Sequence, residues 1–296
     1  MNNNDILHIK EPGKFLSEFT YIDYFYRFML LARSMFKWEN LPNGLKEEWV
    51  ERYLFNEGRC MFFYDSDLGY MIAKVADCGE VNVFDEPIKL LPIATNYGKS
   101  KHYINGVDGV LIKNNDCSLP TSTTIALYSL RIAEITREID INVNEQKTPL
   151  ALKGNSKQIA TLKRMYDQYE GNRPALFIDK GFDGAIESID TQAPVVFDKL
   201  QIQKHELINE CMTFLGLNNA NTQKRERLIT DEVEANNEEI AMNAQIMLKA
   251  RQQAVEEINK IFNLNIKVSL RHDVIEDAKS VEGGEVLWCM QNIRVL

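Results

Sequence analysis

Basic residues gather in one polar segment of the chain. The run NNANTQKRER holds Lys224, Arg225 and Arg227 and contains no apolar residue larger than alanine. Such a run cannot bury much surface, so we expect an exposed loop whose cations can reach an anionic partner. The chain as a whole has a net charge of −9, which argues against a protein whose entire surface grips nucleic acid. A local basic site remains compatible with that charge.

The motifs for phosphate and zinc binding are incomplete. Gly98-Lys99-Ser100 resembles the end of a phosphate loop, but Ile93 stands where the motif needs a glycine. His205-Glu206 begins like the zinc-binding pattern H-E-x-x-H, but Asn209 replaces the second histidine. We therefore expect neither a nucleotide site nor a zinc site.

Asp65 and Asp67 are the remaining candidates for a metal site. They form a D-x-D pair without a third nearby carboxylate, so a solvated turn is the favoured interpretation. The alternative is a sequence-nonspecific DNA-binding enzyme that uses both carboxylates with a metal ion. On the favoured interpretation the protein is not an enzyme and has neither a cofactor nor a metal.

The cysteines and the apolar stretches indicate the cellular compartment of the protein. The five cysteines are scattered and form no C-x-x-C pair, which indicates reduced thiols in a cytosolic protein. The polar start MNNND does not resemble a signal peptide. The most apolar early stretch, Tyr24–Phe36, is too short and too charged to span a membrane. The length of 296 residues allows one large or two ordinary domains.

Two helices must position the basic loop. Pro194 suits a first helical turn, and Gly216 follows the last apolar residues, where a helix often ends. Beyond the loop, Glu238–Phe262 has a second apolar face, and Asn237 is a suitable N-cap. The apolar face of the first helix recurs at spacings of three, four or seven and comprises Val196, Leu200, Leu207, Cys211 and Phe214.

A further long helix is expected over Thr121–Val143, with a small inserted unit after it. In residues 146–191, the strands TPLAL and PALFID flank a short helix that Ser156 opens, and AIESID is a possible third strand. The charged residues Arg131, Glu134, Arg137 and Glu138 lie off the apolar seam of the long helix. That seam alternates steps of three and four and comprises Ile125, Tyr128, Ile132, Ile135 and Ile139.

The N-terminal part combines helices with a β-rich layer. Phe15–Trp38 is predicted as a long aromatic-rich helix, and Leu45–Phe55 as a second one after the breaker ENLPNG. Between Gly58 and Lys113, short runs such as CMFFYD, YMIAKVA, VNVF, KLLPIA and GVLIKN are divided by turn residues, as strands are. Asn265–Leu270 alternates like a half-buried strand. The expected fold class is α+β.

Several stretches resemble the portal protein, also called the upper collar or head–tail connector, of small short-tailed phages of the φ29-like type. These stretches keep the family's order over most of residues 25–270. The most specific is TFLGLNNANTQKRERLITDEV, because it combines unusual residues over a long run. The others are FKWENLP, EQKTPLAL, MYDQYEGNRPALF and EINKIFNLNIKV.

The resemblance implies a fold and an assembly. It implies a portal fold with long stem helices, an α/β wing and a small α/β clip. Twelve copies would form a ring, a homododecamer, around a channel for double-stranded DNA. The implied domains are residues 1–120 for the N-terminal wing, 121–145 and 193–215 for the stem helices, 146–192 for the clip, 216–237 for the channel loop, and 238–296 for the rest of the wing and the C-terminal region.

The resemblance also implies a function and its partners. Lys224, Arg225 and Arg227 in the loop, and Lys199 in the stem, would form basic rings that face the DNA. The ring would assemble in the host cytoplasm and serve genome packaging, head–tail connection and DNA ejection at one capsid vertex of the virion. Its partners would be the major capsid and scaffolding proteins, the packaging ATPase and the lower collar and tail proteins, without a membrane. A tail adaptor ring is the structural alternative.

The chain departs from the family pattern in two places. Relatives carry a lysine shortly before the second stem helix, whereas Asp190 stands at that position here. Relatives also begin with a dense Arg/Lys arm that is associated with packaging RNA, whereas this chain has only Lys10 and Lys14 there. The resemblance therefore supports neither that basic ring nor RNA binding by the N-terminus.

Overall fold

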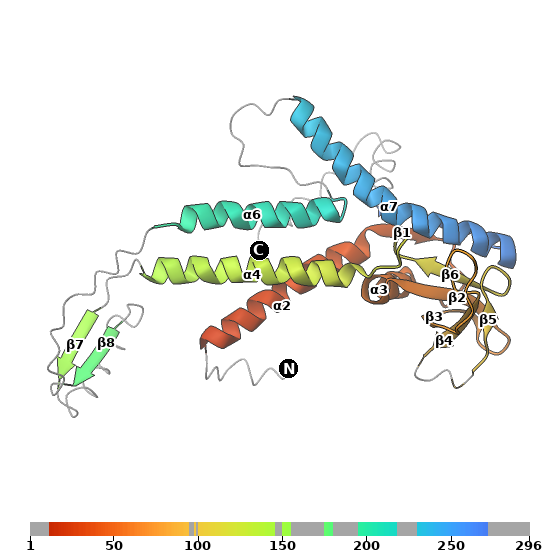
Figure 1. The fold of residues 1–296 in the computed structure, drawn as a ribbon, viewed down its shortest axis with the longest axis horizontal. Helices are drawn as coiled ribbons and strands as arrows, with labels where there is room; N and C mark the ends of the chain where they lie inside the picture. Colours follow the sequence, from red (N-terminus) through yellow and green to blue (C-terminus); the bar gives the residue numbers. More distant parts are fainter. Residues whose placement is uncertain are drawn as a thin grey trace. The chain divides into compact units, whose positions relative to one another are not determined.

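A computed structural model describes residues 12–94, 98, 100–145, 150–154, 175–179, 195–217 and 230–271 (Figure 1). Helices and strands are mixed, which confirms the predicted α+β class. The chain divides into two compact units, one of Met1–Tyr21 with Leu130–Ile208 and the other of Ile22–Ser129 with Asn209–Leu296. The elements are α2 (Pro12–Ser34), β1 (Phe36–Glu39), α3 (Glu47–Glu57), β2 (Arg59–Asp65), β3 (Gly69–Asp77), β4 (Lys89–Ile93), β5 (Tyr103–Ile104), β6 (Gly109–Lys113), α4 (Thr121–Glu145), β7 (Leu150–Gly154), β8 (Ala175–Asp179), α6 (Phe197–Phe214), α7 (Thr230–Phe262) and β9 (Lys267–Leu270).

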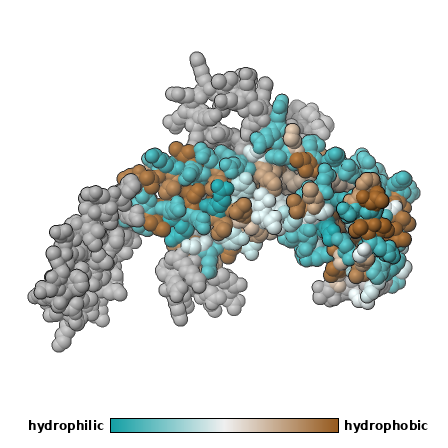
Figure 2. Space-filling model, in the orientation of Figure 1, coloured by the Kyte–Doolittle hydropathy of each residue, from teal (hydrophilic) through white to brown (hydrophobic). Residues whose placement is uncertain are grey.

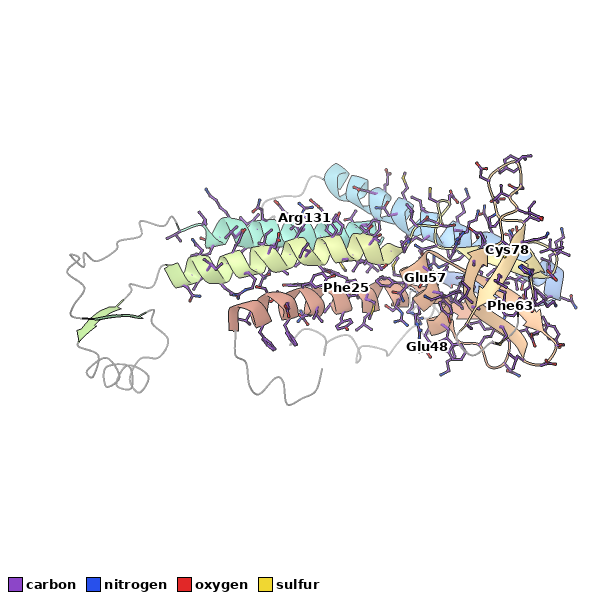
Figure 3. All side chains as sticks on the ribbon, turned by 60° about the horizontal axis from the view of Figure 1, so that its bottom comes forward. Phe25, Glu48, Glu57, Phe63, Cys78 and Arg131 are labelled. Carbon is purple, nitrogen blue, oxygen red and sulfur yellow. The ribbon has the colours of Figure 1, made fainter. Side chains whose placement is uncertain are left out.

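The first unit is built on the outer parts of α4 and α6, which lie side by side (Figures 1 and 3). They run antiparallel, since Asn142 near the end of α4 accepts a 3.1 Å hydrogen bond from the backbone N–H of Val196, just before α6. Ile132 and Ile139 of the predicted seam are buried, whereas Arg131 (labelled in Figure 3) is exposed. The predicted helix over Thr121–Val143 and its apolar seam are therefore confirmed.

The strands β7 and β8 of this unit pair in parallel. Their register runs from Leu150 opposite Ala175 to Gly154 opposite Asp179. A parallel pair needs a long crossover, usually a helix, and the helix predicted after Ser156 falls in that crossover. That helix and the possible third strand AIESID lie outside the described residues. Both predicted strands are confirmed, with their bounds shifted by one or two residues.

The second unit holds a five-stranded antiparallel sheet in the order β5-β4-β3-β2-β6. Strand β2 is buried on both faces. The Phe62 ring lies 5.3 Å from the ring of Phe262 on α7, whereas Phe63 faces the opposite side, with its ring 4.7 Å from that of Tyr103. On that opposite side a core forms from Met61, Phe63, Ala73, Leu90, Tyr103 and Leu111. Burial on both faces explains why CMFFYD is continuously apolar over its first four residues.

Two predictions within the sheet need correction. VNVF is not a strand: the side-chain oxygen of Asn82 accepts hydrogen bonds from the backbone N–H groups of Phe84 (2.8 Å) and Glu86 (3.0 Å), which folds the run into a turn. Asparagine favours such turns because its side chain imitates a backbone acceptor. Strand β5 was missed, because two residues carry no periodicity. The predicted runs over β2, β3, β4 and β6 are confirmed.

The predicted helix over Phe15–Trp38 ends earlier, at Ser34, and residues 36–39 form strand β1. The reason is distant in sequence: β1 pairs antiparallel with β9. Arg271, just after β9, closes the helix end. Its backbone N–H donates to the Met35 carbonyl and its Nε to the Ser34 carbonyl, each at 2.8 Å. The predicted helix over Leu45–Phe55 is confirmed as α3, shifted by two residues.

Helix α7 begins eight residues before the predicted Glu238, at Thr230. Asn237 is therefore inside the helix and is not its N-cap, and the loop expected over 216–237 ends before Thr230. Thr230-Asp231-Glu232 is a suitable helix start, since threonine favours the helix boundary and acidic residues favour the first turn. The weak apolar periodicity of the first two turns hid this start. The predicted strand at Asn265–Leu270 is confirmed as β9.

Helix α6 ends at the predicted glycine. Gly216 has a φ of +70°. Its N–H donates to the Thr213 carbonyl and the Leu217 N–H to the Met212 carbonyl, both at 2.9 Å, which is the Schellman pattern. A Cβ on Gly216 would lie 2.6 Å from the Cβ of Ala244 on α7. Both the turn and the close approach to α7 therefore require glycine.

The four cysteines in the described part of the chain are free thiols. Burial raises the pKa of the Cys60 thiol far above its ordinary value, and it raises the pKa of Cys211 to about 12. Because the thiolate is the reactive form, neither should react in the folded protein. Cys117 is exposed and Cys78 is partly exposed. Among the described helices, none is long and apolar enough to cross a membrane.

Candidate functional site

The structure places one of the four predicted DNA-contacting residues. Lys199 is exposed in the first turn of α6. Lys224, Arg225 and Arg227 lie outside the described residues, as does Asp190. Whether the four candidates lie together is therefore not tested, and their role stays a prediction.

Asp65 and Asp67 lie at the turn between β2 and β3. Asp65 is buried, and its Oδ1 accepts hydrogen bonds from the backbone N–H groups of Asp67 (2.9 Å) and Leu68 (3.2 Å). The turn prediction is confirmed, but Asp65 is not solvated as expected, because its carboxylate replaces the backbone acceptors that the turn lacks. No group of three or more metal-ligating side chains occurs in the described ranges.

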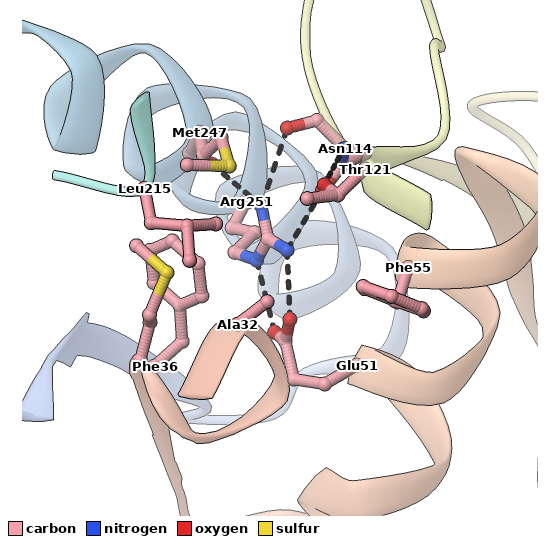
Figure 4. A pocket seen from close by; sticks show the side chains of 10 residues that line it. Ala32, Phe36, Glu51, Phe55, Asn114, Thr121, Leu215, Met247 and Arg251 are labelled. Atoms are coloured by element: carbon pink, nitrogen blue, oxygen red, sulfur yellow. Dashed lines mark hydrogen bonds and ion pairs between the residues drawn. The ribbon is translucent and has the colours of Figure 1, made fainter. Parts of the chain in front are cut away.

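A buried polar site lies at Arg251 of α7, inside the second unit (Figure 4). Arg251 and Glu51 of α3 are each only 2% exposed. The guanidinium donates Nε–H to Glu51 Oε1 at 2.9 Å and Nη2–H to Oε2 at 2.7 Å, a bidentate ion pair. Trp38 of β1 donates its indole N–H to the same carboxylate at 2.9 Å. The Phe36 ring centroid lies 3.9 Å from the guanidinium carbon.

The remaining N–H groups of Arg251 also have acceptors. Nη1 donates to the carbonyls of Met247 (2.9 Å) and Asn114 (3.2 Å), and Nη2 also donates to Oδ1 of Asn114 (3.0 Å). Asn114 in turn donates to the hydroxyl of Thr121, the first residue of α4, at 2.9 Å. All five guanidinium protons are thus satisfied, and one side chain links α7 to α3 and to the start of α4.

This network is a structural joint and not a ligand site. The space between its residues is about 10 Å³, which is at the lower limit for a single water molecule. A buried charge pair without room for a ligand serves to hold its elements in one arrangement, because either partner alone would be costly to bury. The joint therefore fixes where α4 begins relative to α3 and α7.

Sequence reasoning missed Arg251, although a signal was present. Arg251 follows Met247 by four positions and precedes Ala254 and Ile258 by three and seven, so it lies on the predicted apolar face of its helix. A charged residue in that position predicts a buried partner. The sequence could not name the partner, because Glu51 lies 200 residues earlier.

Comparison with known proteins decides the family. The family model "Phage Connector (GP10)" matches residues 5–275, which includes every described helix and strand. The chain belongs to the phage connector family. A connector is the head–tail connector, or portal, protein of a phage virion, so the resemblance drawn from the sequence is confirmed. The family is a structural one.

A solved structure is also similar to this connector. A chain in the structure of the portal and tail of native bacteriophage P68 matches with 16% sequence identity and a TM-score of 0.47. The match covers 92% of the connector described here and 96% of the P68 chain.

Proposed function

We propose that this connector assembles as a ring of twelve copies that forms the DNA channel at one capsid vertex. The observation that carries the proposal is the connector-family match, which spans residues 5–275. In this ring α4 and α6 are the stem, residues 146–192 with β7 and β8 are the clip, and the remaining described elements form the wing. The segment between Gly216 and Thr230 is the channel loop.

Exposed apolar side chains on the helices support an assembly of several copies. Ile22, Tyr26 and Leu30 of α2 are spaced by four residues, so they form one stripe, and all three are exposed. Met242 and Ile246 of α7 form a similar exposed pair. Figure 2 shows hydrophobic side chains among the polar ones at the surface. Contiguous exposed apolar stripes of this kind are typical of protein interfaces.

The ring would act in genome packaging, head–tail connection and DNA ejection. Its partners would be double-stranded DNA, the major capsid and scaffolding proteins, a packaging ATPase, and the lower collar and tail proteins. In a ring each residue occurs once per subunit, so a single lysine becomes a circle of like charges. Each lasting contact with a phosphate strengthens DNA binding in a salt-dependent way. A channel through which DNA slides should therefore contain few such rings of positive charge. The candidates are Lys199 on α6 and the loop residues Lys224, Arg225 and Arg227.

Replacing Lys224, Arg225 and Arg227 together by alanine should leave ring assembly intact and weaken DNA retention after packaging. The salt dependence of DNA release should become flatter, by about one in the log–log slope for each phosphate that the variant no longer neutralises. Retention is measured as nuclease-protected DNA in packaged heads over a salt series. Lys199→Ala should give a smaller effect in the same direction.

The matched control is Lys249→Ala, which removes one exposed charge from α7. This control should leave retention and its salt slope unchanged. If the triple variant behaves like Lys249→Ala, the channel role of the loop is wrong.

A further inference from the structure

The turn between β3 and β4 presents two apolar side chains to solvent. Val83 is 90% exposed and Phe84 is 79% exposed. These two neighbours form what we call the tip. The turn begins after Asp77, close to Cys78, which is labelled in Figure 3. Among the residues that the structure describes, none covers the Phe84 ring, and covering it would remove a large apolar area from water.

The tip is held rigidly. The carboxamide of Asn82 accepts from the backbone of Phe84, and the Asn82 N–H donates to the Glu86 carbonyl at 2.9 Å. Glu86 is itself paired with Lys113 of β6 at 2.7 Å. That bond and the bond from Asn82 hold the pKa of the Glu86 carboxyl below its usual value. A rigid tip loses little conformational freedom when it docks, which favours binding.

The same unit has a pocket of about 410 Å³ near the other end of β3. Tyr64 and Tyr70, on either side of the β2–β3 turn, meet edge to face with ring centroids 5.1 Å apart. Phe262 at the end of α7 meets Tyr70 at 5.9 Å and 90°. Val107 of the pocket lining is also exposed. The pocket is therefore open, and four of its eight lining residues are aromatic, which suits an aromatic guest.

One pair of opposite charges is available between the tip and the pocket. Asp85, directly after Phe84, is exposed. Lys101 and Asp108 both line the pocket. The Lys101 ammonium lies 4.6 Å from the ring centroid of Tyr103, whereas the Asp108 carboxylate accepts a hydrogen bond from the backbone N–H of Ile104. A Phe84 ring in the pocket would leave Asp85 next in sequence and free to approach Lys101. Opposite charges at the rim of an apolar contact favour one orientation of docking over others.

We infer that the tip of one copy of this chain docks into the aromatic pocket of the next copy, with Phe84 against Tyr64, Tyr70 and Phe262. One chain carries both surfaces, so the contact is heterologous, and repeated heterologous contacts close into rings when the rotation allows. The inference rests on the proposed ring and adds a specific contact to it. The exposure of Phe84 shows that the tip does not fill the pocket of its own chain.

Cross-linking of two mixed cysteine variants tests this contact; each keeps the buried Cys60 and Cys211 and gains one exposed thiol. One variant carries Val83→Cys, which leaves the Phe84 ring in place, and the other Val107→Cys, both with Cys78, Cys117 and Cys289 replaced by serine. The variants are mixed before assembly and treated with a short bifunctional thiol reagent. Covalent dimers should form in the mixture at least about tenfold faster than in either variant alone, because docking holds the two thiols at a millimolar local concentration.

The control pair combines Val83→Cys with Leu119→Cys, a site outside the pocket that is exposed to the same degree as Val107. If rings form normally but the pocket pair gives no more covalent dimer than the control pair, the docking contact is wrong. The ring proposal is then unaffected. The serine-substituted parent could fail to form rings although the unmodified chain forms them. In that case Phe84→Ala is made in the unmodified chain. It should lower the ring yield severalfold, whereas Leu119→Ala should not. Failure of the unmodified chain to form rings would overturn both proposals.

Discussion

Replacing Arg251 by methionine is expected to lower the free energy of unfolding of the connector by about 3–5 kcal/mol. Methionine keeps most of the side-chain volume but removes the partner of Glu51, which is buried and makes a bidentate ion pair with Arg251. It also removes the two hydrogen bonds that Arg251 donates to oxygen atoms of Asn114. The measurement is urea unfolding of the unassembled chain, followed by far-UV circular dichroism and by tryptophan fluorescence. Trp38, one of the three tryptophans, contacts the same carboxylate.

Two further variants separate the buried pair from general effects of charge. Arg27→Ala breaks the exposed Arg27–Asp23 pair on α2 and should cost less than about 1 kcal/mol. Adding Glu51→Gln to Arg251→Met should restore at least about 1 kcal/mol, because the neutral amide no longer leaves a buried charge unpaired. If Arg251→Met lowers the free energy of unfolding as little as Arg27→Ala does, Arg251 is not the structural joint described above.

Replacing Gly216 by alanine is expected to cost about 2–5 kcal/mol, since two penalties add. The positive φ at the end of α6 disfavours any residue with a Cβ by about 1–2 kcal/mol. The new Cβ would also lie within 2.8 Å of three atoms of Ala244, two of them backbone, and such overpacking costs about 1–3 kcal/mol. With this Cβ present, α6 and α7 cannot keep their present packing. Urea unfolding of the unassembled chain measures this loss.

Gly69→Ala is the matched control, because Gly69 has a φ of +79° and open space around its missing Cβ. Its cost should be the conformational penalty alone, about 1–2 kcal/mol. The difference between the two variants then measures the contact of Gly216 with α7. Equal losses for both glycines would mean that α7 moves aside without cost.

Local patterns predicted most of the helices and strands. The alternating isoleucines of α4, the Schellman glycine of α6 and the apolar runs of β2 and β6 act over short stretches, so sequence alone shows them. The errors arise where distant residues decide. β1 is a strand because β9 pairs with it. α2 ends at Ser34, where the side chain of Arg271 donates a hydrogen bond to the Ser34 carbonyl. No short stretch of sequence around Phe36 contains β9 or Arg271.

The candidate site was less accessible to sequence reasoning than the fold. Arg251 was detectable as a charge on an apolar face, but its partner Glu51 was not. The tip was mistaken for a strand, because VNVF has strand-forming residues and only Asn82 signals a turn. The assignments of Lys199, Lys224, Arg225 and Arg227 to the channel came from family resemblance and stay predictions. Charge alone does not indicate which face of a subunit meets DNA.

The mass and shape of the assembled chain test the central proposal most directly. Twelve copies of the 34.1 kDa chain give about 410 kDa. Native mass spectrometry of the purified chain should show this species, and negative-stain electron microscopy of the same sample should show rings with an open centre. A stable monomer at micromolar concentration, without rings at any salt concentration, would contradict the proposal that this connector forms a DNA channel.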